Sequence, residues 1–341
     1  MTRSSSTPVV ALDPNEPDPA VLDLAACIVK QGGLVAFATE TVYGLGAVAT
    51  NSAAVARIFE VKGRPALNPV IVHVTGVAQA RECVDEWPKA ADTLAARFWP
   101  GPLTLVLKRS AIIPDVVTAG LDTVAVRAPL GKVAFGLIER TGQPIAAPSA
   151  NRSNRLSPTR ALHVLADLDG RIDLVLDSGP TAVGLESTVI DLTTPVPRVL
   201  RPGPIATSKL ASALGGARLI EHVPSDSIDR PSSPGQMPVH YAPSTASFRA
   251  ESLKDLEAIA TRQDIAVVIF GEQSTPSLPQ FVRQVVLDTP EIASPLLYET
   301  LHRYDLLGLS AIVVVMPPDL PEWEAVRDRL LRATRPLGER R

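Results

Sequence analysis

The hydrophobic positions in the first two-thirds of the chain switch between helical and strand spacing. Apolar residues recur three and four positions apart from Val21 to Val29, between the N-cap signal Asp18-Pro19 and Gly32-Gly33, which predicts a helix. The short apolar run at 34–38 predicts a strand. Further helices are predicted at 52–60, 77–83, 90–97, 133–140 and 159–165, and further strands at 70–74, 103–107, 123–127, 145–147, 174–176, 187–192 and 198–200. Because some strands follow one another directly, the pattern favours a twisted, mixed α/β sheet.

Changes of pattern along the chain divide it into four parts. Residues 1–17 are rich in Ser, Pro and Asp and are expected to form a flexible arm, followed by a first domain over 18–221. Residues 222–248 carry four prolines between 231 and 243 without periodicity, which predicts a linker. Helical and strand patterns alternate again over 249–341, which is typical of a small Rossmann-like α/β domain, here with three strands at 265–270, 284–287 and 311–315.

Net charge and the length of the apolar runs exclude some classes of protein. The 341 residues have a net charge of −3, and residues 1–248 contain 22 basic and 22 acidic side chains, so nothing in the balance indicates a protein whose main partner is nucleic acid. We therefore expect at most a transient contact with nucleic acid. The longest apolar run, 306–316, is about half of the ~20 residues that a membrane span needs. No membrane contact and a cytoplasmic location are expected.

Several common chemical motifs are absent from the sequence. No P-loop pattern occurs, and the two cysteines and five histidines show no metal-ligand spacing, so no metal site built by the protein is expected. The segment Gly44-Leu45-Gly46 with Ala49 formally matches a dinucleotide fingerprint. Five residues separate it from the preceding predicted strand, which argues against that interpretation.

Polar side chains gather instead at predicted strand ends and turns. Lys62 and Arg64 place two cations on a short turn stiffened by Pro65, which suits a polyphosphate, although an exposed basic turn has the same pattern. His73 lies inside an apolar strand, either as a buried core residue or in a site. Arg127 ends another strand and either faces a ligand crevice or makes a structural ion pair.

Two hydroxyl-rich turns follow the predicted strand at 145–147. Pro148-Ser149-Ala150-Asn151 and Ser157-Pro158 offer backbone N–H groups to an anion, and Ser157-Pro158 is equally an ordinary helix N-cap. Later, Glu186-Ser187-Thr188 opens a strand and Arg201-Pro202-Gly203 closes the next one. Each of these segments alone is weak evidence for a site.

Taken in order, the segments resemble a known family. Residues 39–46, 62–65, 148–151, 186–188 and 200–203 occur in the order of the YrdC-like family, and 233–235 with 240–243 resemble the linker of its two-domain form, the threonylcarbamoyl-AMP synthases. The resemblance covers about residues 20–248, and the C-terminal region matches in size and pattern only. It implies a YrdC-like twisted mixed sheet followed by the small α/β domain.

The resemblance also implies a chemistry. Members join L-threonine, bicarbonate or CO2, and ATP with its Mg²⁺ into threonylcarbamoyl-AMP and pyrophosphate, and a downstream threonylcarbamoyl transferase complex then modifies tRNA. The motifs imply that L-threonine is bound by Thr39, His73, Arg127 and Ser187. They imply that ATP is bound by Lys62, Arg64, Thr123, Ser149, Asn151, Ser157, Arg201 and Tyr241, with Lys62, Arg64, Ser149 and Asn151 as the catalytic set. Glu40 is expected to be a partner of Mg²⁺ or of water.

Three positions depart from the family pattern. Ala38 stands where the family usually has proline, and Ala147 where it often has a hydroxyl. Residues 236–239, often basic in the family, are Gln-Met-Pro-Val, so they are left out of the predicted site. Residues 233–243 are expected to lie across the mouth of the site as a lid, with Tyr241 near the nucleotide.

Two other functions stay open from the sequence. A carbamoyl-AMP-forming relative would share the Lys62 and Ser149 motifs without needing a threonine pocket. An RNA-binding or translation-related module is the alternative from another class, and the neutral charge of residues 1–248 argues against it.

Overall fold

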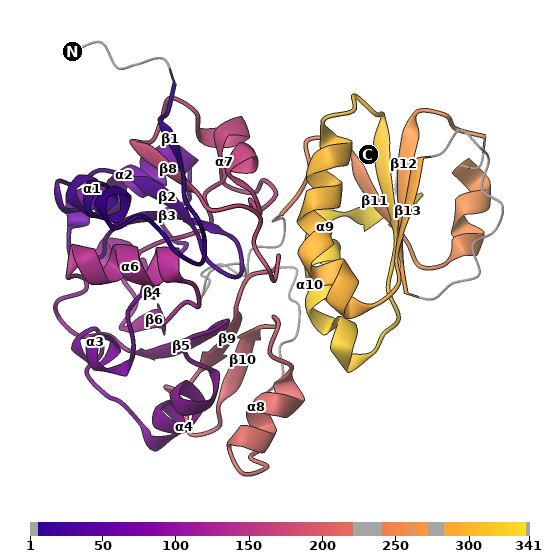
Figure 1. Ribbon diagram of the computed structural model, residues 1–341. Coiled ribbons are helices and arrows are strands. Elements are labelled where there is room, and N and C mark those ends of the chain that lie inside the picture. The colour runs from indigo at the N-terminus through magenta and orange to yellow at the C-terminus, as the bar shows by residue number, and fades with distance from the viewer. Residues whose placement is uncertain (1–5, 221–240, 260, 272–282, 339–341) are drawn as a thin grey trace. The chain divides into compact units, whose positions relative to one another are not determined.

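The computed structural model describes residues 6–220, 241–259, 261–271 and 283–338. The chain divides into two compact units, one of Met1–Ser153 with Ser157–Met237 and one of Asn154–Leu156 with Pro238–Arg341. Figure 1 shows that each unit is built on a sheet of its own. Within the described ranges, no helix has the length and apolar character needed to cross a membrane.

The first unit is organised around a ten-stranded mixed sheet. The strand order is β1-β8-β2-β3-β7-β4-β6-β5-β9-β10. Parallel pairs such as β4 with β6 alternate with antiparallel pairs such as β5 with β6. The bounds are β1 Val9–Ala11, β2 Val35–Ala38, β3 Tyr43–Val48, β4 Ile71–His73, β5 Leu103–Lys108, β6 Thr123–Arg127, β7 Ile145–Ala146, β8 Leu174–Asp177, β9 Thr188–Asp191 and β10 Arg198–Arg201.

Eight helices lie among the described residues of this unit (Figure 1). They are α1 Pro19–Lys30, α2 Ser52–Lys62, α3 Val77–Glu82, α4 Lys89–Phe98, α5 Asp115–Thr118, α6 Lys132–Thr141, α7 Ala161–Leu168 and α8 Thr207–Ala213. Asp18 caps α1, because its Oδ1 accepts the N–H of Ala20 at 2.8 Å. Gly63 ends α2 in the left-handed conformation, at φ 59°, which favours glycine.

Strand alternation explains how the helices pack on the sheet. In β2, Val35 and Phe37 contact the apolar stripes of α1 and α6, whereas Ala36 points to the opposite face, against α2 and α7. Further along the sheet, α3, α4 and α8 cover one face of β4, β5, β6 and β9. The other face of these strands carries a small apolar cluster made only of strand residues, namely Ile71, Val106, Ala125, Val189 and Leu200.

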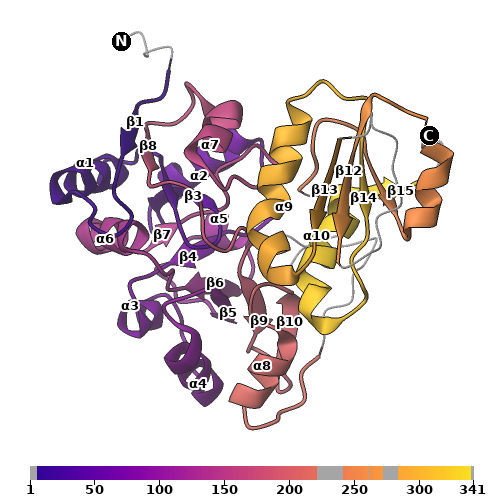
Figure 2. The same ribbon diagram turned by 45° about the vertical axis from the view of Figure 1, so that its right-hand side comes forward.

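The second unit contains a five-stranded parallel sheet in the order β13-β12-β14-β11-β15. Figure 2 shows α9 and α10 on one face of this sheet and η1 on the other. The central strands are apolar and buried, which is typical of a sheet covered on both faces. The bounds are β11 Ser247–Ala250, η1 Leu253–Ile259, β12 Ile265–Phe270, β13 Arg283–Leu287, α9 Pro290–Asp305, β14 Ala311–Val315, η2 Pro321–Trp323, α10 Glu324–Ala333 and β15 Arg335–Pro336.

The three tryptophans divide between the units. Trp87 and Trp99 belong to the first unit, where both are half-buried and their ring centroids lie 6.1 Å apart. Trp323 belongs to the second unit, is 4% exposed, and packs edge-on against Phe270 with ring centroids 6.4 Å apart. Each unit therefore has aromatic packing of its own around indole rings.

The structure corrects three expectations about elements. The hydroxyl- and glycine-rich pattern of residues 39–46 predicts a loop, but residues 43–46 belong to β3. The expected arm includes β1, which pairs in parallel with β8, so the prediction of a free arm is wrong for that strand. The second sheet has five strands rather than three, because β15 is a two-residue strand and β11 begins at Ser247, inside the expected linker. Residues 222–240 lie outside the described residues, and the four predicted boundaries stay predictions.

Candidate active site

Strand alternation brings several predicted site residues to the sheet face that carries the strand-only apolar cluster. Thr123 and Arg127 share this face with Ala125 of the strand-only apolar cluster, and His73 shares it with Ile71. His73 and Arg127 are register partners on parallel strands β4 and β6, so their side chains leave the sheet side by side. The face therefore has a small apolar floor bordered by polar groups from β4 and β6.

Arg127 is buried and held on three sides. Its Nε donates to the carbonyl of Gly101 at 3.2 Å, and its Nη1 donates to Thr41 Oγ1 at 2.9 Å. Its Nη2 lies 2.7 Å from Glu40 Oε2, and the two side chains are 3% and 6% exposed. Both interpretations of Arg127 thus apply, since it faces the candidate site and also makes a buried ion pair.

The loop between β2 and β3 supplies two of these partners, Glu40 and Thr41. Thr39 Oγ1 donates to the carbonyl of Val42 at 2.8 Å and lies 2.8 Å from Thr41 Oγ1, which fixes the hydroxyl that contacts Arg127. Glu40 Oε2 also accepts the N–H of Leu130 at 3.1 Å. The loop therefore joins the predicted threonine residues Thr39 and Arg127 into one hydrogen-bonded group.

His73 is a neutral imidazole at neutral pH. Burial, and then the neighbouring Arg127 guanidinium, lower its pKa from 6.5 to about 3. Its Nδ1 is buried without a hydrogen-bond partner. A neutral ring beside a guanidinium adds polarity to the site without adding charge.

Lys62 and Arg64 form a second buried cation cluster. Lys62 Nζ donates to the carbonyl of Ser149 at 2.6 Å and to the carbonyl of Asn151. Arg64 donates through Nε to the carbonyl of Asn68 at 3.0 Å and through Nη2 to that of Pro69 at 2.7 Å. Burial and the charge of Arg64 hold the pKa of Lys62 well below its usual range. The structure thus joins Lys62 to the segment 149–151, as the predicted catalytic set requires.

Ser187 and Arg201 are also in contact. Arg201 donates through Nε to the carbonyl of Ser187 and through Nη2 to its hydroxyl, both at 3.1 Å. The Ser187 hydroxyl lies 2.7 Å from Thr104 Oγ1 on β5. Gly203 makes this arrangement possible, because a Cβ there would lie 2.4 Å from the backbone nitrogen of Thr188.

The remaining predicted site residues are Ser157, Thr123 and Tyr241. Ser157 hydrogen-bonds to Glu186 Oε1 at 2.5 Å, and both side chains are buried. Thr123 is half-buried at the start of β6. Tyr241 belongs to the second unit, where it is 1% exposed and has Tyr298 at 5.9 Å between ring centroids and Arg329 at 5.3 Å from its own. Its predicted role in ATP binding and the predicted lid over 233–243 stay predictions, and residues 233–240 lie outside the described residues.

Sequence reasoning missed three contributors to these contacts. Thr41 and Thr104 touch Arg127 and Ser187, and Glu186 holds Ser157. Thr104 could have been identified from the sequence, because strand alternation places it on the same face as Val106 of the strand-only apolar cluster. Glu40 was expected to be a partner of Mg²⁺ or water, and the structure pairs it with Arg127 instead.

The residues present do not build a magnesium site. In the part of the chain that the structure describes, no three His, Cys, Asp or Glu side chains are grouped closely enough to hold a metal ion. Glu40 already has a guanidinium and a backbone N–H as partners.

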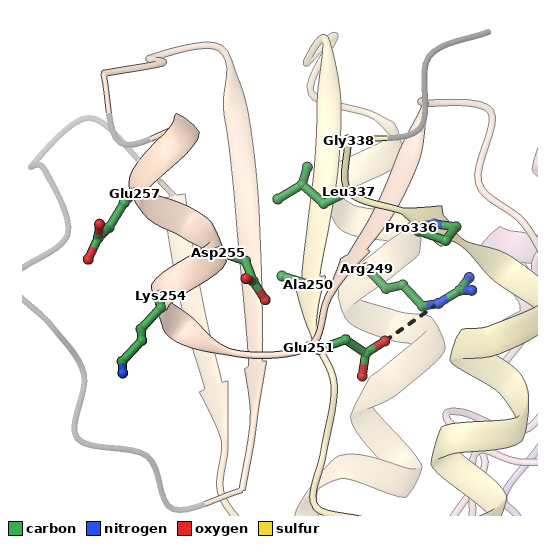
Figure 3. Close-up of a pocket in the computed structure, with 9 residues that line it drawn as sticks. All are labelled: Arg249, Ala250, Glu251, Lys254, Asp255, Glu257, Pro336, Leu337 and Gly338. Atoms are coloured by element: carbon green, nitrogen blue, oxygen red, sulfur yellow. Dashed lines mark ion pairs between the residues drawn. The ribbon is translucent and has the colours of Figure 1, made fainter.

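The second unit contains a cavity of about 650 Å³ (Figure 3). It lies at the carboxyl ends of β11 and β15 and beside η1, and it is lined by mixed charges from Arg249, Glu251, Lys254, Asp255 and Glu257. Arg249 and Glu251 lie 3.9 Å apart as an ion pair. None of the predicted site residues lines this cavity, and nothing in its lining indicates a particular ligand.

Two family models match the chain. One, described as "Telomere recombination", covers residues 27–203, and the other, described as "Threonylcarbamoyl-AMP synthase, C-terminal domain", covers 205–334. The fold and the first match define the class, a protein built on the domain that Sua5, YciO and YrdC share.

Comparison with individual relatives identifies the family more specifically. The threonylcarbamoyl-AMP synthase of Pyrococcus abyssi is 42% identical over 319 residues, with 91% of this chain and 93% of the relative covered. The enzyme of that name from Bacillus subtilis is 39% identical, with 93% of each covered. The solved structure of P. abyssi Sua5 complexed with L-threonine matches with a TM-score of 0.87 at 38% identity, over 96% of this chain and 99% of that one. This chain belongs to the threonylcarbamoyl-AMP synthase family, and the predicted family and fold class are confirmed.

Proposed function

We propose that this chain joins L-threonine, bicarbonate or CO2, and ATP to form L-threonylcarbamoyl-AMP and pyrophosphate. The observation that carries the proposal is the pair of buried cation clusters in the first unit. Arg127 is accompanied by a carboxylate, which suits an amino acid, whereas Lys62 and Arg64 are held by backbone carbonyls, which suits a polyphosphate. The P. abyssi relative has been solved with L-threonine, and the likeness extends over 99% of that chain.

The reaction needs two bond-forming steps. The neutral amine of threonine attacks the carbon of CO2, which forms an N–C bond and releases a proton to give the carbamate. A carbamate oxygen then attacks the α-phosphorus of ATP, and the bond to pyrophosphate breaks. No covalent intermediate with the protein is required, so catalysis rests on positioning and on stabilising the charge of the leaving group.

The residues have distinct parts in this scheme. Thr39, His73, Arg127 and Ser187 bind L-threonine, and Arg127 receives its carboxylate. Lys62 and Arg64 stabilise the charge that develops on pyrophosphate, beside Ser149 and Asn151. A lysine ammonium has three N–H donors, and two of them are used on the carbonyls of Ser149 and Asn151, which leaves one for a phosphate oxygen. Thr123, Ser157 and Arg201 complete the nucleotide side.

The proposal also includes Mg²⁺, a downstream transferase complex and tRNA. Mg²⁺ enters bound to ATP and neutralises part of its charge. The product is a mixed anhydride, which a downstream threonylcarbamoyl transferase complex consumes to modify tRNA. Contact between this chain and tRNA is transient, because residues 1–248 carry equal numbers of basic and acidic side chains.

The test is the substrate dependence of pyrophosphate release by the full chain. We expect release only when ATP, L-threonine and bicarbonate are all present. Equal turnover without threonine would contradict the proposal and favour a carbamoyl-AMP-forming enzyme. Lys62→Ala is the matched negative control, because it removes a nucleotide contact and leaves the Arg127 group unchanged.

A further inference from the structure

Glu40 and Arg127 form a buried ion pair in which one atom of each partner, Oε1 of Glu40 and Nη2 of Arg127, makes no hydrogen bond. Glu40 Oε1 is buried and accepts no hydrogen bond, although Oε2 of the same carboxylate is used twice. Arg127 Nη2 lies 2.7 Å from Glu40 Oε2, yet its N–H groups are not aligned on that oxygen and Nη2 has no hydrogen-bond partner. A buried carboxylate oxygen without a donor is costly, so its retention indicates a ligand that supplies one.

The two unused atoms are complementary to one kind of ligand. An α-amino acid carries a carboxylate and an ammonium on neighbouring atoms, and both are charged near neutral pH. With its carboxylate on Arg127 Nη2 and its ammonium on Glu40 Oε1, positive and negative groups would alternate. A lone anion would satisfy Arg127 but would repel Glu40.

The described neighbours of this ion pair, His73, Thr41 and Gly101, add no further charge. His73 contributes a neutral ring, since burial and Arg127 depress its pKa to about 3. Thr41 and Gly101 hold the other two nitrogens of Arg127 through a hydroxyl and a carbonyl. The group as a whole is neutral, as expected for a site that receives a zwitterion.

We propose that Glu40 Oε1 binds the α-ammonium of L-threonine while Arg127 binds its carboxylate, so that Glu40 selects amino acids over acids that lack an amine. The proposal rests on the proposed function, since it concerns the same substrate. Glu40 acts by orienting the amine.

The experiment compares two ligands by calorimetry on the full chain. L-threonine has the ammonium, and (2S,3R)-2,3-dihydroxybutanoate has a hydroxyl in its place. For the unsubstituted chain we expect L-threonine to bind about 10- to 150-fold more tightly than the dihydroxy acid, which corresponds to one charged hydrogen bond. Equal binding of the two ligands would overturn the proposal without any substitution.

The Glu40→Gln variant distinguishes two roles of Glu40, binding of the α-ammonium and support of Arg127. It keeps the shape and an acceptor for Leu130 N–H, so we expect the preference for L-threonine to fall to about 3-fold or less. Thr41→Val removes a hydroxyl that contacts Arg127 and Thr39 but leaves Glu40 unchanged, so both ligands should lose affinity equally and the preference should remain. Glu139→Gln, at an exposed carboxylate on α6, is the matched control and should change neither ligand.

The outcomes distinguish the two proposals. If Glu40→Gln weakens both ligands equally, Glu40 only supports Arg127 and the inference is overturned. If the unsubstituted chain fails to bind L-threonine at all, the proposed function itself fails. Retained ATP-analogue binding in Glu40→Gln shows that the variant is folded.

Discussion

The two buried cation clusters of the first unit balance their charge in opposite ways. Arg127 has the carboxylate of Glu40 at 2.7 Å, and the group is neutral before any ligand binds. Lys62 and Arg64 are held by backbone carbonyls, whose dipoles stabilise the cations without cancelling their charge. The contacts described for the first cluster include a carboxylate, whereas those described for the second come from backbone carbonyls.

This difference indicates what each cluster receives. A neutral group can bind a zwitterion with little change in total charge, while two neighbouring cations attract a polyanion such as a triphosphate. Burial, and then the neighbouring charge of Arg64, depress the pKa of Lys62, and the charge of Asp167 opposes this shift. Four substitutions test the comparison, in order of decreasing expected effect.

Arg127→Met should cause the largest change, because it leaves the carboxylate of Glu40 buried without its counter-ion. We expect the free energy of unfolding to fall by about 3–5 kcal/mol, measured by chemical denaturation. The double variant Arg127→Met/Glu40→Leu should recover most of this loss, since both charges are removed. A double variant no more stable than the single one would show that the pair is not compensated as described.

Lys62→Ala should act on catalysis through the nucleotide. We expect kcat/KM for ATP to fall about 10²- to 10³-fold, as for loss of one preorganised donor to a developing charge, with the affinity for L-threonine unchanged. Steady-state pyrophosphate release and threonine calorimetry give the two readings. Lys132→Ala, at an exposed lysine of α6, is the control. An equal loss of threonine affinity would contradict the division into two clusters.

Gly203→Ala should loosen the contact that joins the two groups of site residues through Ser187 and Arg201. The new methyl would meet the backbone at Thr188 at 2.4 Å, so we expect a loss of about 1–3 kcal/mol in the free energy of unfolding. Gly76→Ala is matched to it, because its φ of 166° suits any residue and no atom lies within 4 Å of the added methyl. Equal melting temperatures for the two variants would argue against this role of Gly203.

His73 should make stability depend on pH in the acid range. Below pH 6.5 the unfolded chain binds a proton at this ring, whereas the folded ring stays neutral down to about pH 3, so stability falls as pH falls between these values. His73→Gln should reduce the slope of unfolding free energy against pH by about 1.4 kcal/mol per unit in that window. Parallel curves for the two proteins would show that the ring is protonated in the fold.

Some of the site was predictable from local pattern alone. Alternation in Thr123-Val124-Ala125-Val126-Arg127 places Arg127 on the face opposite the valines, and the structure agrees. The helix ending at Lys62 and the turn through Gly63 likewise follow from short-range signals. Here Gly63 is required for its positive φ, since no atom crowds its Cβ position.

Other features depend on residues far away in the chain. Glu40 finds Arg127 only after the sheet has formed, so its neighbours in sequence could not identify its partner. Strand β3 was expected to be loop because Gly44 and Gly46 weaken a strand pattern. Gly46 is there to admit the ring of Phe37, whose Cε1 would lie 2.8 Å from a Cβ. Similarly, β1 is a strand only because Val9 meets Val175 on β8.

The placement of the three tryptophans gives each unit a natural fluorescent reporter. Emission from Trp87 and Trp99 originates in the first unit, while Trp323, buried against Phe270, reports on the second. In a Trp323→Phe chain the indole signal follows the first unit alone, and in a Trp87→Phe/Trp99→Phe chain it follows the second. The melting of each unit can therefore be recorded separately in the intact polypeptide, without cutting the chain or attaching a dye.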